Sequence, residues 1–166
     1  MLNRFFLYLL SNFFNMLEFN DFGYLIPDRN IPSSIIEFET NFKYNNARNT
    51  IYKKYISYCI DLKAIINKDI KQWIDGSYVT KRVFPQDIDI VSFINHEDYE
   101  IYEKDLKNFI YPNSKRFYEI DAYLIIVYPE SHKKNFYYKS DYAEWLINFS
   151  RDMRTNNKKG FLELIV

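Results

Sequence analysis

The sequence predicts a single α/β or α+β domain in which a small mixed sheet is flanked by helices. Its 166 residues are 48% hydrophobic, which suits one buried core but leaves little room for a second domain. Amphipathic helix patterns come first along the chain, and runs rich in β-branched residues follow, separated by further helix patterns. That order is typical of helices packed on a sheet of mixed strand direction.

We interpret residues 1–20 as an N-terminal extension and place the domain at 21–166. The apolar run 5–10 is shorter than the hydrophobic region of a signal peptide, lacks a small-residue cleavage site and is too short to span a bilayer. A single cysteine, Cys59, excludes a disulfide framework. We therefore expect a cytoplasmic protein with no membrane segment, and Met16 can serve as an internal start.

The first half of the domain should consist of one loop and two helices. Residues 21–34 concentrate proline, glycine, asparagine and serine, which predicts an extended loop crossing the surface. Ser33 or Ser34 can then cap a helix that carries two phenylalanines one turn apart. A second helix is predicted over Asn49–Asn67, where steps of four and three separate the apolar positions Ile51, Tyr55, Tyr58, Leu62 and Ile65.

Two strands joined through a turn should form the centre of the domain. Lys71–Ile74 is a short strand pattern, Asp75–Ser77 is a turn, and Asp87–Ile94 is a second strand rich in β-branched residues. Asn95 is a suitable cap for a following helix, and Pro112 should end that helix.

The last third should add one strand, one helix and an apolar end. Phe117–Tyr128 is interpreted as a long strand, and Ser140 as the cap of a final amphipathic helix. A basic, turn-like segment, Arg151–Gly160, then precedes the apolar run Phe161–Val166.

Charge composition limits how the protein can attract a partner. Lys plus Arg number 22 and Asp plus Glu number 22, so no overall field draws in nucleic acid. This balance disfavours a nucleic-acid-binding module, and any grip on an anionic ligand must come from a local cluster.

Asp87 and Asp89 are the first candidate site residues. Alternation along a strand would direct both carboxylates to one face while Ile88 and Ile90 point to the other. Two acidic groups this close repel one another unless a cation lies between them. Their oxygens suit a hard cation that also binds phosphate, so we expect Mg²⁺, or Mn²⁺ in its place.

Gly76 and Ser77 form the second candidate element. A glycine directly after a strand lets the backbone approach a phosphate closely, and backbone N–H groups and the serine hydroxyl can donate to its oxygens. An ordinary Gly-Ser turn is the alternative reading. The Asp-x-Asp strand ten residues beyond the serine favours the phosphate-binding interpretation.

Gly-Ser followed on the next strand by Asp-x-Asp resembles the DNA polymerase β-like nucleotidyltransferase superfamily, whose members transfer a nucleotidyl group from an NTP with two metal ions. The resemblance implies that fold, a triphosphate held at Gly76 and Ser77, and metal ions held by Asp87 and Asp89. A third carboxylate on a neighbouring strand would complete the metal and catalytic set. We assign it to Asp121, with Glu119 on the same face of the predicted strand as the alternative.

From residue 22 onward the chain also resembles an uncharacterised bacterial family of nucleotidyltransferase-like proteins. The resemblance rests on the Gly23–Pro27 loop, Glu37, Phe38, Phe42, the Gly76–Thr80 block, Pro85–Val91, Lys159 and Gly160. The second glycine of the minimal nucleotidyltransferases of toxin–antitoxin operons is missing here, and Lys81 and Arg82 occupy that region. We expect Lys81 to contact the nucleotide, and Arg151, Arg154, Lys158 and Lys159 could form a second basic flap.

The expected function is therefore transfer of a nucleoside monophosphate from an NTP to an acceptor, with Asp121 orienting or deprotonating the attacking hydroxyl. The acceptor could be a protein side chain, an RNA end or a small molecule. The rival interpretation is a non-catalytic protein that kept the fold, such as one component of a toxin–antitoxin pair.

Overall fold

The structure is a computed structural model that describes residues 17–166. The apolar run 5–10 and Met16, about which the sequence analysis made predictions, lie outside this range. Two short strands open the described chain, β1 (Glu18–Phe19) and β2 (Leu25–Ile26), and they pair antiparallel. Among the helices of the described residues, none combines the length and the apolar character needed to cross a membrane.

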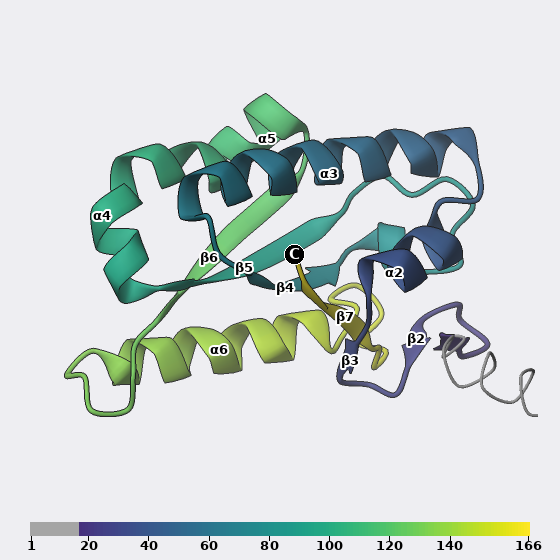
Figure 1. Ribbon diagram of the computed structural model, residues 1–166. Helices are drawn as coiled ribbons and strands as arrows, with labels where there is room; N and C mark the ends of the chain where they lie inside the picture. Colours follow the sequence, from purple (N-terminus) through teal and green to yellow (C-terminus); the bar gives the residue numbers. More distant parts are fainter. Residues whose placement is uncertain (1–16) are drawn as a thin grey trace, which may run out of the picture.

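A five-stranded mixed sheet flanked by helices forms the centre of the fold, which confirms the predicted α/β architecture (Figure 1). The strand order is β3-β7-β4-β5-β6. The outer pairs β3·β7 and β5·β6 are parallel, whereas β7·β4 and β4·β5 are antiparallel. The strands are β3 (Asn30–Pro32), β4 (Lys71–Asp75), β5 (Asp89–Asn95), β6 (Asp121–Val127) and β7 (Phe161–Ile165).

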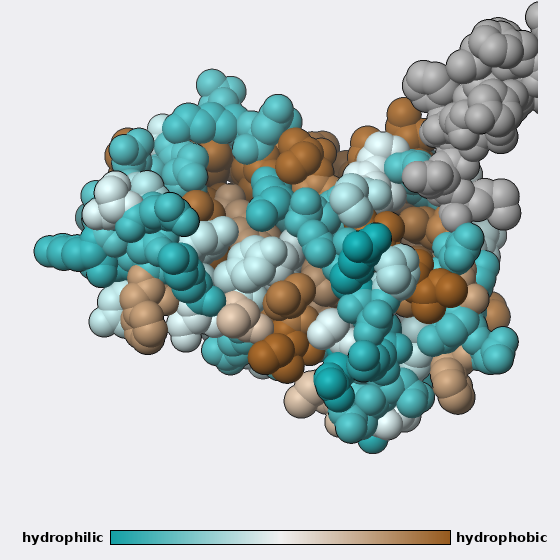
Figure 2. Space-filling view, turned by 90° about the horizontal axis from the view of Figure 1, so that it is seen from below, coloured by the Kyte–Doolittle hydropathy of each residue, from teal (hydrophilic) through white to brown (hydrophobic). Residues whose placement is uncertain are grey.

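Each face of the sheet packs against its own helices (Figure 1). On one face, α3 (Asn46–Ile66), α4 (His96–Leu106) and α5 (Asn113–Tyr118) cover buried residues that include Ile74, Ile90, Ala122 and Leu162. On the other, α6 (Asn135–Phe149) covers a second buried cluster that includes Trp73, Val91, Ile125 and Phe161. Hydrophilic and hydrophobic residues are interspersed over the described part of the α6 side (Figure 2).

The first two helices of the described chain begin where local capping chemistry allows. Ser34 caps α2 (Ile35–Phe42): its hydroxyl accepts from the Glu37 N–H while the Glu37 carboxylate accepts from the Ser34 N–H. The side chain of Asn45 caps α3, which therefore starts three residues before the predicted Asn49. The buried stripe of this helix contains the predicted Tyr55, Tyr58 and Leu62.

Two predicted boundaries in the last third are wrong. Asn113–Tyr118 forms helix α5, and Glu119 ends it in a left-handed conformation with φ of 57°, so the strand begins at Asp121 and not at Phe117. Helix α6 begins at Asn135, five residues before the predicted cap Ser140. The buried Asn135 side chain donates to the Tyr128 carbonyl, a tertiary contact that no local pattern announces.

Two further predictions need correction. The helix from His96 ends at Leu106 and continues as a single 3₁₀ turn, η2 (Lys107–Phe109), ahead of Pro112. The predicted surface loop 21–34 includes strands β2 and β3, because β3 gains backbone partners along β7.

A buried arginine fixes the segment that follows β4. The guanidinium of Arg48, on α3, donates to the backbone carbonyls of Phe42, Tyr78 and Arg82, and the side chain is fully buried. Buried carbonyls need such partners, so Arg48 ties the loop after Gly76 to the helical layer.

Replacing Arg48 by methionine should lower the free energy of unfolding by about 3 kcal/mol or more, because the buried carbonyls of Phe42 and Tyr78 lose their arginine donor and the part-buried carbonyl of Arg82 loses one of its donors. Urea denaturation followed by far-UV circular dichroism measures this change. Lys53→Met, at an exposed position of the same helix, is the matched control and should change stability by about 0.5 kcal/mol or less. Equal stability of the two variants would contradict the anchoring role.

Candidate functional site

Strand register brings three aspartates together at one end of the sheet. Asp75 pairs with Asp89 across the antiparallel β4·β5 ladder, and Asp89 pairs with Asp121 across the parallel β5·β6 ladder. Residues paired across neighbouring strands project to the same face, so the three side chains form a row on the α6 side of the sheet. Sequence analysis missed Asp75, which it assigned to a turn.

The row concentrates negative charge in a poorly hydrated position. The pKa of Asp89 is raised to about 7 by burial first and then by repulsion from Asp75, Asp87 and Asp121. Burial likewise raises the pKa of Asp75 to about 6, although Lys159 opposes that rise. A cation that enters the site would therefore relieve the repulsion that raises the pKa of Asp89.

Of the two candidates for the third carboxylate, Asp121 lies beside Asp89 and Glu119 does not. Glu119 is exposed at the end of α5 and forms an ion pair with Lys54 at 2.7 Å. Asp121 begins β6, and its Oδ2 accepts from the Lys115 ammonium at 3.0 Å. Its Oδ1 is buried and has no hydrogen-bond partner among the described residues.

Gly76 adopts a conformation that other residues rarely reach, with φ of +86°. A Cβ at this position would lie 3.0 Å from the Asp89 Oδ2 and 3.1 Å from the Asp87 carbonyl oxygen. Glycine thus lets the backbone turn closely past the carboxylates. The short 3₁₀ helix η1 (Ser77–Val79) starts directly after it.

The structure corrects the predicted position of Asp87. This residue precedes β5 and does not share the strand with Asp89. Its Oδ1 accepts from the Ser77 N–H at 2.8 Å and also from the Ser77 hydroxyl. The two Ser77 donors that were expected to meet a phosphate therefore hold a carboxylate oxygen, which shows that they can converge on one anionic atom.

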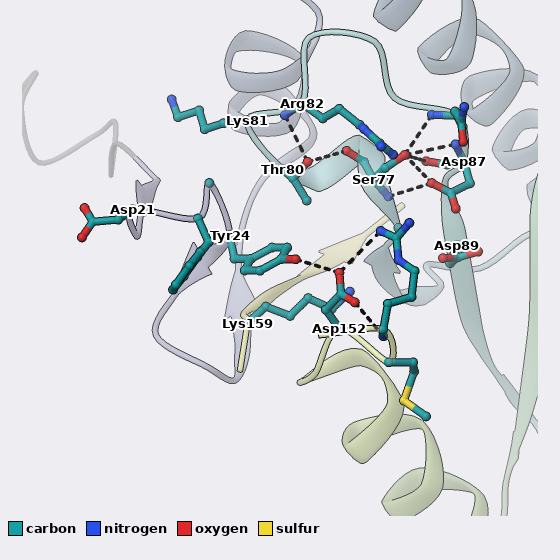
Figure 3. Close-up of a pocket in the computed structure, with 16 residues that line it drawn as sticks. Asp21, Tyr24, Ser77, Thr80, Lys81, Arg82, Asp87, Asp89, Asp152 and Lys159 are labelled. Carbon is teal, nitrogen blue, oxygen red and sulfur yellow. Dashed lines mark hydrogen bonds and ion pairs between the residues drawn. The ribbon is translucent and has the colours of Figure 1, made fainter. Parts of the chain in front are cut away.

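These residues surround a cleft of about 740 Å³ (Figure 3). Ser77, Asp87 and Asp89 lie along one side of it, and Tyr24, Asp152 and Lys159 lie along another. The Tyr24 hydroxyl donates to the Asp152 Oδ2 at 2.7 Å, which joins the N-terminal segment to the turn ahead of β7. The cleft is lined by Asp21, Phe22, Gly23, Tyr24, Gly76, Ser77, Thr80, Lys81, Arg82, Gln86, Asp87, Asp89, Asp152, Met153, Arg154 and Lys159.

The predicted basic residues divide into three groups. Lys81 and Arg82 are exposed at the cleft, and the Lys81 ammonium lies 4.2 Å from the centre of the Phe19 ring. Arg154 and Lys159 also line the cleft, but only Lys159 is buried. Arg151 and Lys158 are not among the lining residues.

A divalent cation has a restricted set of ligands here. No group of three or more His, Cys, Asp or Glu side chains is arranged to hold a metal ion within residues 17–166. Of the expected ligands, Asp89 and Asp121 would be the ones to hold it, because repulsion raises the pKa of Asp89 and the Asp121 Oδ1 lacks a hydrogen-bond partner among the described residues, whereas Asp87 is bound to Ser77. Mg²⁺ is commonly bound by one or two carboxylates, with phosphate and water as its remaining ligands.

The raised pKa of Asp89 predicts how stability changes with pH. Between about pH 4 and pH 7 the native state holds this proton more tightly than the unfolded state does, so stability should fall as the pH rises through that window. In EDTA, the stability of the Asp89→Asn variant should fall less with rising pH than that of the parent. At about pH 8 the variant should therefore unfold at a higher temperature than the parent. Differential scanning fluorimetry measures both effects.

The exposed variant Asp105→Asn, on α4, is the control and should follow the parent at every pH. If the stability of the parent increased through the same window, or if Asp89→Asn kept the pH dependence of the parent, the pKa of Asp89 would not be raised in the native state.

Comparison with known proteins gives a family but no activity. Residues 17–165 match a family of unknown function (DUF6932). No curated protein and no solved structure matches the chain. Since the family match covers nearly all of the described residues, the chain belongs to the DUF6932 family of unknown function.

Proposed function

We propose that this protein is a metal-dependent nucleotidyltransferase with a polymerase β-like fold. The observation that carries the proposal is the placement of Asp89 and Asp121 at paired positions of parallel strands, beside the Gly76 turn. Carboxylates that can hold a metal beside a turn with backbone N–H donors would suit nucleotidyl transfer, because the metal and the donors together can neutralise a triphosphate. It is also the arrangement implied by the resemblance of the Gly-Ser and Asp-x-Asp motifs to that superfamily.

The triphosphate of an NTP would lie against Gly76 and Ser77. The Ser77 N–H and hydroxyl already bind one carboxylate oxygen of Asp87, and a phosphate oxygen is an acceptor of the same kind. Asp87 would yield these donors when the nucleotide binds and then face the metal. Lys81 and Arg82 line the same cleft and can neutralise the outer phosphates.

Asp89 and Asp121 would hold Mg²⁺ or Mn²⁺, which when bound neutralises phosphate charge and lowers the pKa of the attacking hydroxyl. The acceptor oxygen forms a bond to the α-phosphorus, and the bond from that phosphorus to the bridging oxygen of pyrophosphate breaks. We assign orientation of the acceptor hydroxyl, and receipt of its proton, to Asp121.

A second candidate is a non-catalytic protein of the same fold, such as a toxin–antitoxin component. One observation favours it: Asp87 is bound to Ser77 and Asp121 to Lys115, so two of the three expected metal ligands already have partners. Under this alternative the protein could still bind nucleotide, but it would transfer nothing.

Nucleotide binding gives the first test. Mg²⁺ together with the correct NTP should raise the melting temperature of the parent, because a ligand that binds the native state stabilises it. Asp89→Asn should lose most of this shift, whereas the exposed control Glu119→Gln should keep it. Each of the four NTPs is tested separately by scanning fluorimetry. A parent that responds to none of them would contradict the proposal.

Transfer gives the second test and separates the two candidates. Incubation with labelled NTP, Mg²⁺ and cell lysate should label an acceptor. Asp121→Asn should reduce labelling by about two orders of magnitude or more while nucleotide affinity stays within about tenfold. Glu119→Gln is the matched control, because that carboxylate is exposed and paired with Lys54. Nucleotide binding by a parent that labels no acceptor would favour the non-catalytic alternative.

A further inference from the structure

Lys159 is a buried lysine in the wall of the cleft, and the proposed reaction does not yet use it. Its side chain is 11% exposed, and its ammonium donates to the Asp75 Oδ2 at 2.5 Å. Asp75 is its only hydrogen-bond partner among the described residues. Because an ammonium carries three N–H donors, two donors remain for a ligand in the cleft.

The backbone holds Lys159 firmly in this position. Its N–H donates to the Ser150 carbonyl at 2.9 Å, and the N–H of Gly160 donates to the Leu25 carbonyl at 2.7 Å. A Cβ on Gly160 would lie 2.3 Å from the Pro27 carbonyl oxygen, so only glycine permits this close approach. The lysine is therefore fixed between the C-terminal turn and strand β2.

The positive charge of Lys159 affects titratable groups on both sides of the cleft. It opposes the rise in the pKa of Asp89 on one side and that of Tyr24 on another. Figure 3 shows Lys159 below Tyr24, across the cleft from Ser77 and Asp89. Lys159 thus lines the cleft, and its charge acts on groups at both sides of it.

If Asp75 and Lys159 formed a purely structural ion pair, several of their hydrogen-bond donors and acceptors would have no partner. The Asp75 Oδ1 is buried without a hydrogen-bond partner among the described residues, and the ammonium uses one donor of three. Buried pairs repay their loss of hydration only when the remaining donors and acceptors are also bonded. An incompletely bonded pair at a cleft is better explained by a ligand that completes it.

We propose that Lys159 is a polyphosphate-binding residue, which contacts the phosphate chain from the wall of the cleft while Asp75 serves as its counterion in the ligand-free protein. The identification of that chain as part of an NTP rests on the proposed function. An extended polyanion fits better than a single small anion, because Lys81, Arg82 and Lys159 all border a cleft of about 740 Å³. Ser77 supplies further donors between them.

Inorganic triphosphate is the probe, with isothermal titration calorimetry in EDTA so that no metal site contributes. The decisive variant is the double substitution Asp75→Asn with Lys159→Met, which keeps the net charge and leaves no unpaired buried carboxylate. It should bind triphosphate about tenfold or more weakly than the parent, the scale of one charge-assisted hydrogen bond. Lys158→Met removes an exposed cation one residue away and should change the affinity by about twofold or less.

Asp75→Asn alone supplies a readout that a merely structural pair would not give. It removes the counterion but keeps the lysine, so triphosphate should bind at least as tightly as to the parent. The inference is overturned if the double variant binds like the parent, if Lys158→Met loses as much affinity, or if the parent binds no triphosphate. Failure of the proposed function would show separately, as triphosphate binding without Mg²⁺-dependent transfer.

Discussion

The register of three neighbouring strands sets the chemistry of this protein. Pairing of Asp75 with Asp89, and of Asp89 with Asp121, aligns three carboxylates at one end of the sheet. The free energy of placing like charges side by side at low hydration must be offset by cations or by protonation. The cations at the two ends of the row, Lys159 and Lys115, pair with the outer aspartates, while burial and repulsion raise the pKa of Asp89 in the middle to about 7.

The site is formed by a rigid sheet on one side and by loops on the others. The three aspartates lie on strands that are packed on both faces, so their spacing is fixed by the core. The other walls come from chain segments far apart in sequence, which the Tyr24 to Asp152 hydrogen bond joins. Arg48 fixes the loop after Gly76 from the helical side. This combination suits a ligand that is held at one fixed end and enclosed by loops at the other.

Sequence reasoning succeeded where the determinants are local. The capping of α2 by one of two adjacent serines, the stripe of α3 and the placement of Asp89 on a strand all follow from spacing within a few residues. Helix α5 was missed because the aromatic residues Phe117 and Tyr118 continue into a β-branched run, and the break at Glu119 requires a left-handed residue that no glycine marks.

The candidate site was predicted only in part, for a different physical reason. Strand alternation predicted which face of the sheet Asp89 occupies, but it also placed Asp87 on the same strand. In the structure, Asp87 accepts a hydrogen bond from Ser77. The pairing of Asp75 with Lys159 spans 84 residues and depends on strand order and register, which a single sequence does not reveal. The spacing of residues in the sequence thus identified the motif, whereas strand pairing in the fold determined which charged side chains lie together.

The most direct test of the account is a crystal structure with Mn²⁺ and a non-hydrolysable NTP analogue, with the anomalous signal of manganese locating the metal. The account predicts a manganese peak between the carboxylates of Asp89 and Asp121 and a triphosphate against Gly76 and Ser77. Manganese bound elsewhere, or a cleft in which Asp87 keeps Ser77 and no nucleotide enters at saturating concentration, would contradict it.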